Sequence, residues 1–530
     1  MFQKIRELSK DLAIYGIGDV AISVLNFLLL PIYVRYLSPD DYGVLGLLGS
    51  VEVAAKIFFR WGLDGSFMRF YYDCGTPAER RRLASTLFFF LLIVNGALLI
   101  AALGTSGAFA ARLFGGQEHV RALQLTLLNT FVIAFTFFPF HLLRIEKRSV
   151  EFGLLTFSRS VGTLILRIVL IIGLGFGVLG VVIADIVVTA LLMVVLIRRF
   201  APLIRPMFSW PDLRTSLRFG LPRVPHAAAQ QVIAVGDKFV LALYAPLSQV
   251  GIYSMGVSFG LTQKLFLSAF EYAWAPFYYA NAKEPDAKNI LSSVTTYGFA
   301  VLALLTAGLS AVGEDLLLAV VGPDYRSAAG VVTWTAVGVL FQGIYLLTSI
   351  GLNLTKRTEY YPVATTIAAA VNIALNLLLI PRVGFIGAAW ATAAAYAVQA
   401  AAAFRFSQRF YPMAYETSRL VRIAVAAAAA VVAARLLPEM APLAGLLVRG
   451  SVVVALFGAG LWTSGFFKAE ELARLVTLRS RRSEPAVLHS SLTTEMAGEI
   501  VASGTLDPQV DASGPQLDRA AEPGVNVEPR

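Results

Sequence analysis

The sequence predicts an all-α membrane protein that crosses the bilayer about fourteen times. Hydrophobic residues make up 57% of the chain and charged residues only 15%, with a mean hydropathy of +0.69, whereas soluble domains carry about 25% charged residues. Apolar runs long enough to span a bilayer as helices recur along most of the chain. Matching residues also recur after about 208 positions, which indicates two similar halves.

The composition excludes several classes of protein. The net charge of +10 does not indicate nucleic-acid binding, because Lys and Arg form short clusters between the apolar runs, as cytoplasmic loops do. Cys74 is the only cysteine, so neither an intrachain disulfide nor a CxxC metal site can form. The sequence has no Walker A run, Ser-His-Asp arrangement or cluster of metal ligands, and we therefore expect no cofactor, no metal and no enzymatic activity.

Each part of the chain has an expected place in this architecture. Residues 1–10 put apolar side chains at helical spacing beside Lys4, Arg6 and Lys10, which is typical of an amphipathic helix on the cytoplasmic surface. A positive flank that only fixes the topology is an equal alternative. From about residue 480 the chain is rich in Ser, Pro, Gly, Asp and Glu, so we expect residues 471–530 to form a disordered cytoplasmic tail. The predicted spans between these ends lie near residues 11–34, 42–63, 83–104, 120–143, 152–174, 178–197, 219–244, 251–277, 290–313, 328–353, 361–380, 385–404, 420–437 and 443–466.

The distribution of positive charge gives the expected orientation. If residues 1–10 lie in the cytoplasm, the segments on that side hold several times as many Lys and Arg residues as the opposite side. The bias recurs from one pair of spans to the next. Since positive loops stay on the cytoplasmic side of a membrane, we expect both termini in the cytoplasm and short loops outside.

An internal repeat divides the spans into two lobes. The positions that match after a shift of about 208 residues include Gly43 with Gly251 and Lys56 with Lys264. Each copy holds an even number of spans, so the two copies share an orientation and are related by a pseudo-twofold axis along the membrane normal. We expect a six-helix N-lobe over residues 11–200, a six-helix C-lobe over residues 201–410, and two additional helices over residues 411–470. The lobes would face each other across a central cavity and rock to give alternating access.

The predicted span near residues 219–244 carries a polar face. Its members are Arg223, His226, Gln230 and Asp237, which fall on one side of a helix. An ionisable group that faces lipid near the bilayer centre costs roughly 2.5–3.5 kcal/mol on insertion scales. We therefore expect this face to line a bundle interior or a water-filled path.

Other ionisable residues within the spans are candidates for the lining of the same cavity. The candidates for substrate binding are Lys56, Arg60, Arg159, Arg167, Arg223, His226, Gln230 and Lys264. The candidates for binding a coupling ion are Asp19, Glu52, Asp237 and Glu271. The excess of Lys and Arg favours an anionic substrate, because both make charge-assisted hydrogen bonds to phosphate. Two alternatives remain open: polar side chains can join neighbouring helices by hydrogen bonds, and Arg60 and Arg223 can extend to the membrane interface.

Three motifs lie at or near the ends of the spans. They are PIYVRYLSPDDYG at residues 31–43, GLDGSFMRF at residues 62–70, and the series GLPRVPH, GDKF and VGIY at residues 220–226, 236–239 and 250–253. Over roughly residues 8–470 the chain resembles the Wzx-type flippases of lipid-linked oligosaccharides. These belong to the multidrug/oligosaccharidyl-lipid/polysaccharide exporter (MOP) superfamily. Some motif residues also have structural interpretations: Ser38 and Pro39 can begin a helix, and Gly43 and Gly251 can allow two helices to approach closely.

The resemblance implies a function. It implies that the protein moves an undecaprenyl-pyrophosphate-linked oligosaccharide, such as a lipopolysaccharide O-antigen unit or an exopolysaccharide unit, from the cytoplasmic to the periplasmic leaflet. Transport would use no ATP and would pass through a central cationic cavity. The implied partners are the lipid-linked glycan, the bilayer, a possible H⁺ or Na⁺ counter-ion, and possibly a polysaccharide polymerase or assembly proteins. The identity of the glycan does not follow from the resemblance.

Other functions remain as alternatives. A lipid II flippase or a drug/cation antiporter of the same superfamily would share the architecture. Lipid II flippases typically carry an adjacent Arg-Asp pair in the first helix, whereas the first span here offers only Asp19. A membrane glycosyltransferase or polymerase would need catalytic groups on a large outer loop, and Asp40-Asp41 in a short loop is the only acidic pair there.

Overall fold

The computed structural model describes residues 30–468, and within this range every regular element is a helix. Each predicted span from residues 42–63 onward coincides with one helix or with a run of consecutive helices, which confirms the all-α membrane fold. Most of the first predicted span, the amphipathic segment 1–10 and the tail at residues 471–530 lie outside the described residues.

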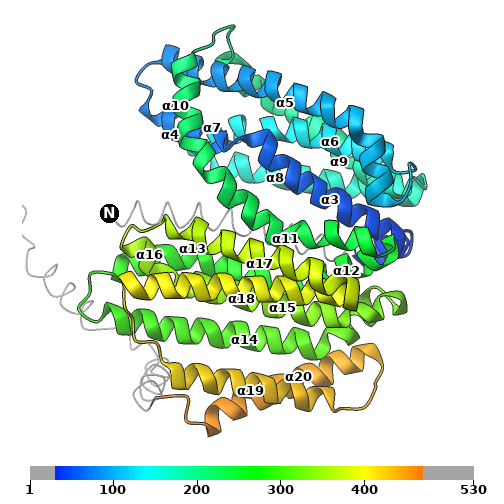
Figure 1. Cartoon of the computed structure of the whole chain (residues 1–530), viewed down its shortest axis with the longest axis vertical. Coiled ribbons are helices and arrows are strands. Elements are labelled where there is room, and N and C mark those ends of the chain that lie inside the picture. Colours follow the sequence, from blue (N-terminus) through cyan, green and yellow to red (C-terminus); the bar gives the residue numbers. More distant parts are fainter. Residues whose placement is uncertain (1–29, 469–530) are drawn as a thin grey trace, which may run out of the picture. The chain divides into compact units, whose positions relative to one another are not determined.

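The first repeat is described from the end of its first predicted span onward. Its helices are α2 (Leu30–Val34), α3 (Pro39–Arg60), α4 (Leu63–Asp73), α5 (Pro77–Phe114), α6 (Val120–Phe135), α7 (Phe137–Ile145), α8 (Ser149–Ile168), the π-helix η1 (Val169–Gly173) and α9 (Gly177–Phe200). Figure 1 shows these helices in blue and cyan.

A linker and the second repeat follow. Their helices are η2 (Ala201–Leu203), α10 (Trp210–Gly220), η3 (Leu221–Arg223), α11 (Val224–Tyr244), α12 (Leu247–Gly260), η4 (Leu261–Gln263), α13 (Lys264–Asn281), α14 (Ala287–Val320), η5 (Pro323–Ala328), α15 (Ala329–Thr348), α16 (Ile350–Leu354), α17 (Tyr360–Val383) and α18 (Phe385–Phe410). The last two helices, α19 (Thr417–Arg435) and α20 (Pro442–Thr463), pack on α14 (Figure 1).

In the described part of the chain, eleven helical segments are long and apolar enough to cross a membrane. The segments α11 and α12–α13 are not among them. Helix α11 holds Gln230, Gln231, Asp237 and Lys238, which lower its hydropathy. Helix α11 is the helix on which the polar face was expected.

The start of α3 has the cap that its sequence predicts. The Ser38 hydroxyl accepts a hydrogen bond from the backbone N–H of Asp41 at 3.2 Å, and the Asp41 carboxylate accepts one from the backbone N–H of Ser38 at 2.9 Å. Pro39 occupies the first turn, where its missing N–H costs nothing. This capping box explains why the helix begins directly after the SPDD sequence.

Reciprocal contacts join α3 of the first repeat to α12 of the second. A Cβ atom on Gly43 would collide with the carbonyl oxygen of Leu247, and a Cβ on Gly251 would collide with that of Pro39. Leu247 and Gly251 follow Pro39 and Gly43 by the same 208 positions in the sequence. Such paired contacts are characteristic of a twofold axis.

A second conformational match comes from the loops after α7 and α16. Lys147 and Lys356 are two of the three described non-glycine residues with a positive φ, at 55° and 59°. Each follows a short helix and precedes an arginine. A left-handed backbone is uncommon outside glycine, and here it occurs at two positions 209 residues apart in the sequence.

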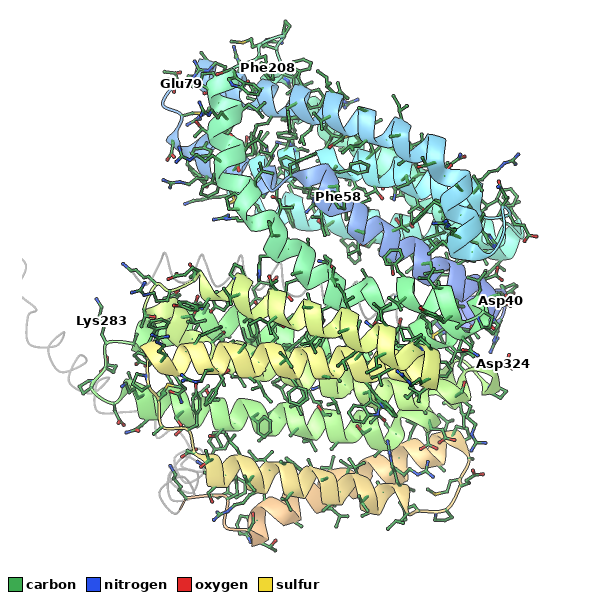
Figure 2. All side chains as sticks on the ribbon, in the orientation of Figure 1. Asp40, Phe58, Glu79, Phe208, Lys283 and Asp324 are labelled. Atoms are coloured by element: carbon green, nitrogen blue, oxygen red, sulfur yellow. The ribbon has the colours of Figure 1, made fainter. Side chains whose placement is uncertain are left out.

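The loops lie at two opposite ends of the helices (Figure 2). Asp40 and Asp324 lie at one end, and Glu79, Phe208 and Lys283 lie at the other. This separation agrees with the alternation of loops expected from the charge pattern, which assigns the first pair to the outside and the other three to the cytoplasm. We refer to the two ends as the Asp40 end and the Glu79 end.

Candidate functional site

A fixed break between α3 and α4 positions the first candidate residues. Trp61 and Gly62 both adopt left-handed backbone conformations, with φ of 52° and 67°, and this turns the chain sharply. The carbonyl of Phe59 accepts a hydrogen bond from Nδ2 of the buried Asn95 at 2.7 Å. The indole N–H of Trp61 donates to Oδ1 of the same side chain at 3.0 Å. Helix α5 therefore stabilises the break through one amide side chain.

The turn packs directly on the start of the second repeat. A Cβ on Gly62 would lie 2.5 Å from the carbonyl oxygen of Gly220, and a Cβ on Gly220 would lie 2.7 Å from that of Gly62. Nearby, the Ser66 hydroxyl donates to the carbonyl of Ser216 at 2.8 Å. The two backbones touch with no room for a side chain between them. The motifs at residues 62–70 and 220–226, distant in the sequence, thus meet in space.

A cavity of 350 Å³ lies beside this contact, and we call it the cationic pocket. Its lining residues are Val53, Lys56, Ile57, Arg60, Gly62, Asp64, Gly65, Arg223, Val224, Ala227 and Gln231. Three lining side chains are cationic and one is a carboxylate. Three of the substrate-binding candidates, Lys56, Arg60 and Arg223, therefore meet here from both repeats.

The cations of the pocket differ in how far they are neutralised. Lys56 Nζ lies 2.5 Å from Oε1 of Glu52, one helical turn away, so this pair is close to neutral. Arg60 Nη1 lies 3.9 Å from Oδ2 of Asp64, too far for a hydrogen bond. The Nε atom of Arg60 is buried and has no hydrogen-bond partner within residues 30–468. Arg60 therefore retains donors for a ligand.

Arg223 reaches the pocket along the surface of α4. Its guanidinium carbon lies 4.4 Å from the ring centroid of Phe219, a distance suited to a cation–π interaction. A Cβ on Gly65 would lie 3.1 Å from Nη1 of Arg223, so the absence of a side chain at Gly65 leaves space for the guanidinium. An aromatic ring holds the group but does not cancel its charge, so the pocket keeps a net positive charge.

A second polar centre lies inside the C-lobe around the buried Asp237. The Tyr253 hydroxyl donates a hydrogen bond to Oδ2 of Asp237. The Thr392 hydroxyl donates to the same oxygen at 3.1 Å, and the backbone N–H of Lys238 donates to Oδ1 at 2.8 Å. The GDKF and VGIY motifs are thus joined through one carboxylate.

Two asparagines of α17 extend this centre. Asn372 Nδ2 lies 3.3 Å from the Thr392 hydroxyl oxygen, and Asn376 Nδ2 donates to Oδ1 of Asn372 at 3.0 Å. Oδ1 of Asn376 is buried and has no hydrogen-bond partner in the described part of the chain. We call Asp237, Tyr253, Asn372, Asn376 and Thr392 the Asp237 cluster. It combines a carboxylate, two hydroxyls and amide oxygens, which are ligand types that suit a hard cation.

The polar face expected on the 219–244 span divides between these two centres. Arg223 lines the cationic pocket, whereas Gln230 lies 3.3 Å from Gln399 of α18 and Asp237 contacts α12 and α18. His226 is half-buried, and its buried Nδ1 has no partner within the described range. Gln230 and Asp237 therefore point into the C-lobe. Gln231, rather than Gln230, lines the cationic pocket.

The remaining candidates lie elsewhere. Arg167 forms hydrogen bonds with both carboxylate oxygens of Asp185, at 2.7 and 2.8 Å, and Arg159 precedes it on α8. Lys264 and Glu271 are exposed on α13. Asp19 lies outside the described residues.

Sequence reasoning missed several members of the two centres. Asp64 lies in the GLDGSFMRF motif but was not among the predicted site residues. Gln231 is adjacent to the predicted candidate Gln230. Asp185 is the only charged residue in the predicted span at 178–197, a signal that could have identified it as the partner of an intramembrane arginine. Tyr253 and Thr392 carry no charge and gave no signal.

Two solved structures share the fold of this chain. The chain is similar to the structure of the lipid II flippase MurJ in an inward closed conformation, with a TM-score of 0.67 at 15% identity, covering 84% of this chain and 97% of that one. It is also similar to an inward-facing multidrug resistance MATE family transporter of the MOP superfamily, with a TM-score of 0.62 at 14% identity, covering 77% and 98%. The chain therefore shares its fold with these two transporters, as the resemblance implied.

The sequence matches the model of a known protein family. A family model described as "polysaccharide biosynthesis protein" matches residues 32–329, more than half of the chain. The chain belongs to this family. No curated protein sequence matches it.

Proposed function

We propose that this protein transfers an anionic lipid-linked glycan from the cytoplasmic to the periplasmic leaflet of a bacterial inner membrane. The observation that carries the proposal is the cationic pocket, in which Lys56 and Arg60 of one repeat meet Arg223 of the other. Arginine and lysine recognise phosphate through charge-assisted hydrogen bonds. The undecaprenyl pyrophosphate carrier that the family resemblance implies presents such a group.

The transport path runs between the repeats. Helix α3 contacts α12 near Pro39 and Gly43, close to the Asp40 end, and lines the pocket near its other terminus. The pyrophosphate binds at the pocket from the cytoplasm, the glycan occupies the hydrated space, and the prenyl tail stays in lipid. Rocking of the lobes then closes the Glu79 end, and the lobes separate near the α3–α12 contact to open the Asp40 end.

The Asp237 cluster supplies a second element of this proposal, the binding of a coupling ion. Its carboxylate is buried, and the unpartnered Oδ1 of Asn376 adds an oxygen ligand. Either H⁺ or Na⁺ can neutralise such a group. Transport assays in vesicles with separately imposed pH, Na⁺ and voltage gradients distinguish these ions from a drive by the membrane potential alone.

A reconstituted transport assay tests the main proposal. The purified full-length protein is placed in proteoliposomes with a labelled undecaprenyl-pyrophosphate oligosaccharide, and the label that reaches the opposite leaflet is measured. We expect Arg60→Gln combined with Arg223→Gln to reduce transfer at least tenfold. The matched control is Arg121→Gln, because Arg121 is exposed and lies outside the pocket.

The same assay separates the alternatives. Full transfer by the double variant would overturn the role of the pocket. A change in the mass of the lipid-linked glycan would indicate a glycosyltransferase or polymerase. Faster transfer of labelled lipid II than of the oligosaccharide would favour the lipid II flippase.

A further inference from the structure

The linker between α9 and α11 is held against the first repeat along one side. The backbone N–H of Arg205 donates to the Ser85 hydroxyl at 2.8 Å, and that of Ser209 donates to the Thr86 hydroxyl at 3.0 Å. Leu213 of α10 is fully buried within the hydrophobic core of this repeat. The linker is therefore a docked element with one defined outer face.

The only acidic residue of α10 lies on the side of this helix that packs on the first repeat. Asp212 accepts a hydrogen bond from Arg82 Nε at 2.7 Å, so its charge is neutralised. Ser66 holds the same helix through the carbonyl of Ser216. The charged side chains that remain on α10 are arginines.

The outer face combines exposed apolar and cationic side chains. Phe208 and Trp210 are 55% and 64% exposed, and Met207 is also exposed. Trp210, Arg214 and Arg218 follow one another at intervals of four residues and therefore lie on one side of α10. Arg205, Arg214 and Arg218 are exposed. We call these six residues the linker surface.

The position of this surface indicates its partner. Phe208 lies at the same end of the helices as Glu79 and Lys283 (Figure 2), the end that the charge pattern assigns to the cytoplasm. Directly after α10 the chain enters the helix α11, so the surface lies at the level where the bilayer meets water. Tryptophan is enriched at this level.

We propose that the linker surface binds anionic phospholipid headgroups of the cytoplasmic leaflet. Arg205, Arg214 and Arg218 contact the phosphates, and Met207, Phe208 and Trp210 insert among the first carbons of the acyl chains. A free phosphate would satisfy only the arginines and would leave the apolar side chains in water. Clusters of basic residues next to a membrane span attract anionic lipid. The lipid contact is separate from the transport path.

A fluorescence experiment tests this contact in the full-length protein. Cys74 is replaced by Ser, the exposed Thr215 of α10 is replaced by Cys, and an environment-sensitive dye is attached. The protein is inserted into nanodiscs of phosphatidylcholine alone or with phosphatidylglycerol, and quenching by the uncharged quencher acrylamide is measured. We expect at least twofold weaker quenching with phosphatidylglycerol and no effect of added inorganic phosphate. Arg214→Gln with Arg218→Gln should abolish the difference between the lipids.

Two further variants keep the test decisive. Arg214→Lys with Arg218→Lys keeps the charge and should keep the lipid dependence, and Arg121→Gln, remote from the linker, should leave it unchanged. Equal quenching in both lipids would overturn the proposal. Loss of the difference in the lysine variant would also overturn it, because the effect would then not depend on charge.

Discussion

Gly43 and Gly251 occupy equivalent positions in the two repeats, and each lies against the backbone of the helix that carries the other. A Cβ on Gly251 would collide with the carbonyl oxygen of Pro39, and one on Gly43 with that of Leu247. No substitution at either position is free of a clash. At the α3–α12 contact, direct packing of backbone atoms therefore fixes the distance between the two helices.

The first prediction concerns this contact. Gly43→Ala should destabilise the protein by about 1–3 kcal/mol, because added volume at a tight contact forces the helices apart. Gly49→Ala on the same helix is the matched control, since a Cβ there would meet nothing within 4 Å and alanine favours a helix. Thermal unfolding in detergent measures both. Equal stability of the two variants would contradict the observed packing.

The second prediction concerns the pair Glu52 and Lys56. Either single reversal, Glu52→Lys or Lys56→Glu, leaves like charges one turn apart and should lower the unfolding temperature. The double reversal restores the pair and should recover the stability. Transport should not recover, because the pocket then presents a carboxylate at position 56. Recovery of transport along with stability would mean that Lys56 serves only as the partner of Glu52.

The third prediction separates charge from structure at Asp237. Asp237→Asn keeps an oxygen that can accept from Tyr253 and Thr392 and should preserve the fold, while it removes the negative charge. We expect transport to lose its dependence on the ion gradient that drives the wild type. Asp237→Ala should in addition lower the thermal stability, because two buried hydroxyls lose their acceptor. An Asn variant that still responds to the gradient would exclude Asp237 as the ion ligand.

The fourth prediction concerns the attachment of α19 and α20. Asp315 of α14 and Arg449 of α20 form a 2.7 Å ion pair with side chains only 5% and 12% exposed. Asp315→Asn should cost about 3–5 kcal/mol, because it leaves a buried arginine without a counter-charge. Glu439→Gln is the control, since the Arg326–Glu439 pair is exposed and such pairs contribute little. Limited proteolysis and thermal unfolding should show loosening of α20 only in the first variant.

The fifth prediction concerns Cys74, which lies in the loop between α4 and α5. Burial raises the pKa of its thiol above the ordinary value, and the nearby Glu79 and Asp212 raise it further. At neutral pH less thiolate is present, so reaction with a membrane-impermeant maleimide should be slow and should accelerate as the pH rises beyond about 9. The control is Lys283→Cys in a Cys74→Ser background, because Lys283 is exposed at the same end. Equal rates at neutral pH would contradict this environment.

The sidedness of the membrane can be read from the same labelling experiment. Cys74 and a cysteine at position 283 should react from the cytoplasmic side only. Labelling of both from the periplasmic side would reverse the orientation inferred from the positive loops.

The helices were predictable because hydropathy is a local property of the chain. Each predicted span within the described residues became a helix, and the cap at Ser38 could be read from four residues. The sequence also predicts a repeat, since Gly43 and Gly251 match at a constant offset. The helices and the cap depend only on residues that are close together in the sequence. The repeat depends only on one constant offset between two segments.

The two centres were only partly predictable because their members come from distant segments. Lys56, Arg60 and Arg223 could be named as charges inside spans, but nothing local showed that Gly62 would lie against Gly220. The carboxylate of Asp237 was visible, whereas its partners Tyr253 and Thr392 are uncharged. Helical periodicity placed Gln230 on the same side as Arg223, but α11 contacts both repeats along its length, so one side faces different neighbours at different depths.

In the proposed rocking motion, the glycine crossing of α3 and α12 would be the pivot about which the Glu79 end of α3 swings. Arg60 lies about 25 Å along α3 from Gly43 at the rise of an α-helix. A tilt of about 10° at the crossing would carry Arg60 through about 4 Å, nearly one helical turn. A tightly packed contact at one end of α3 would thus allow a large displacement at the other end. The contact can be this tight because Gly43 and Gly251 have no side chains.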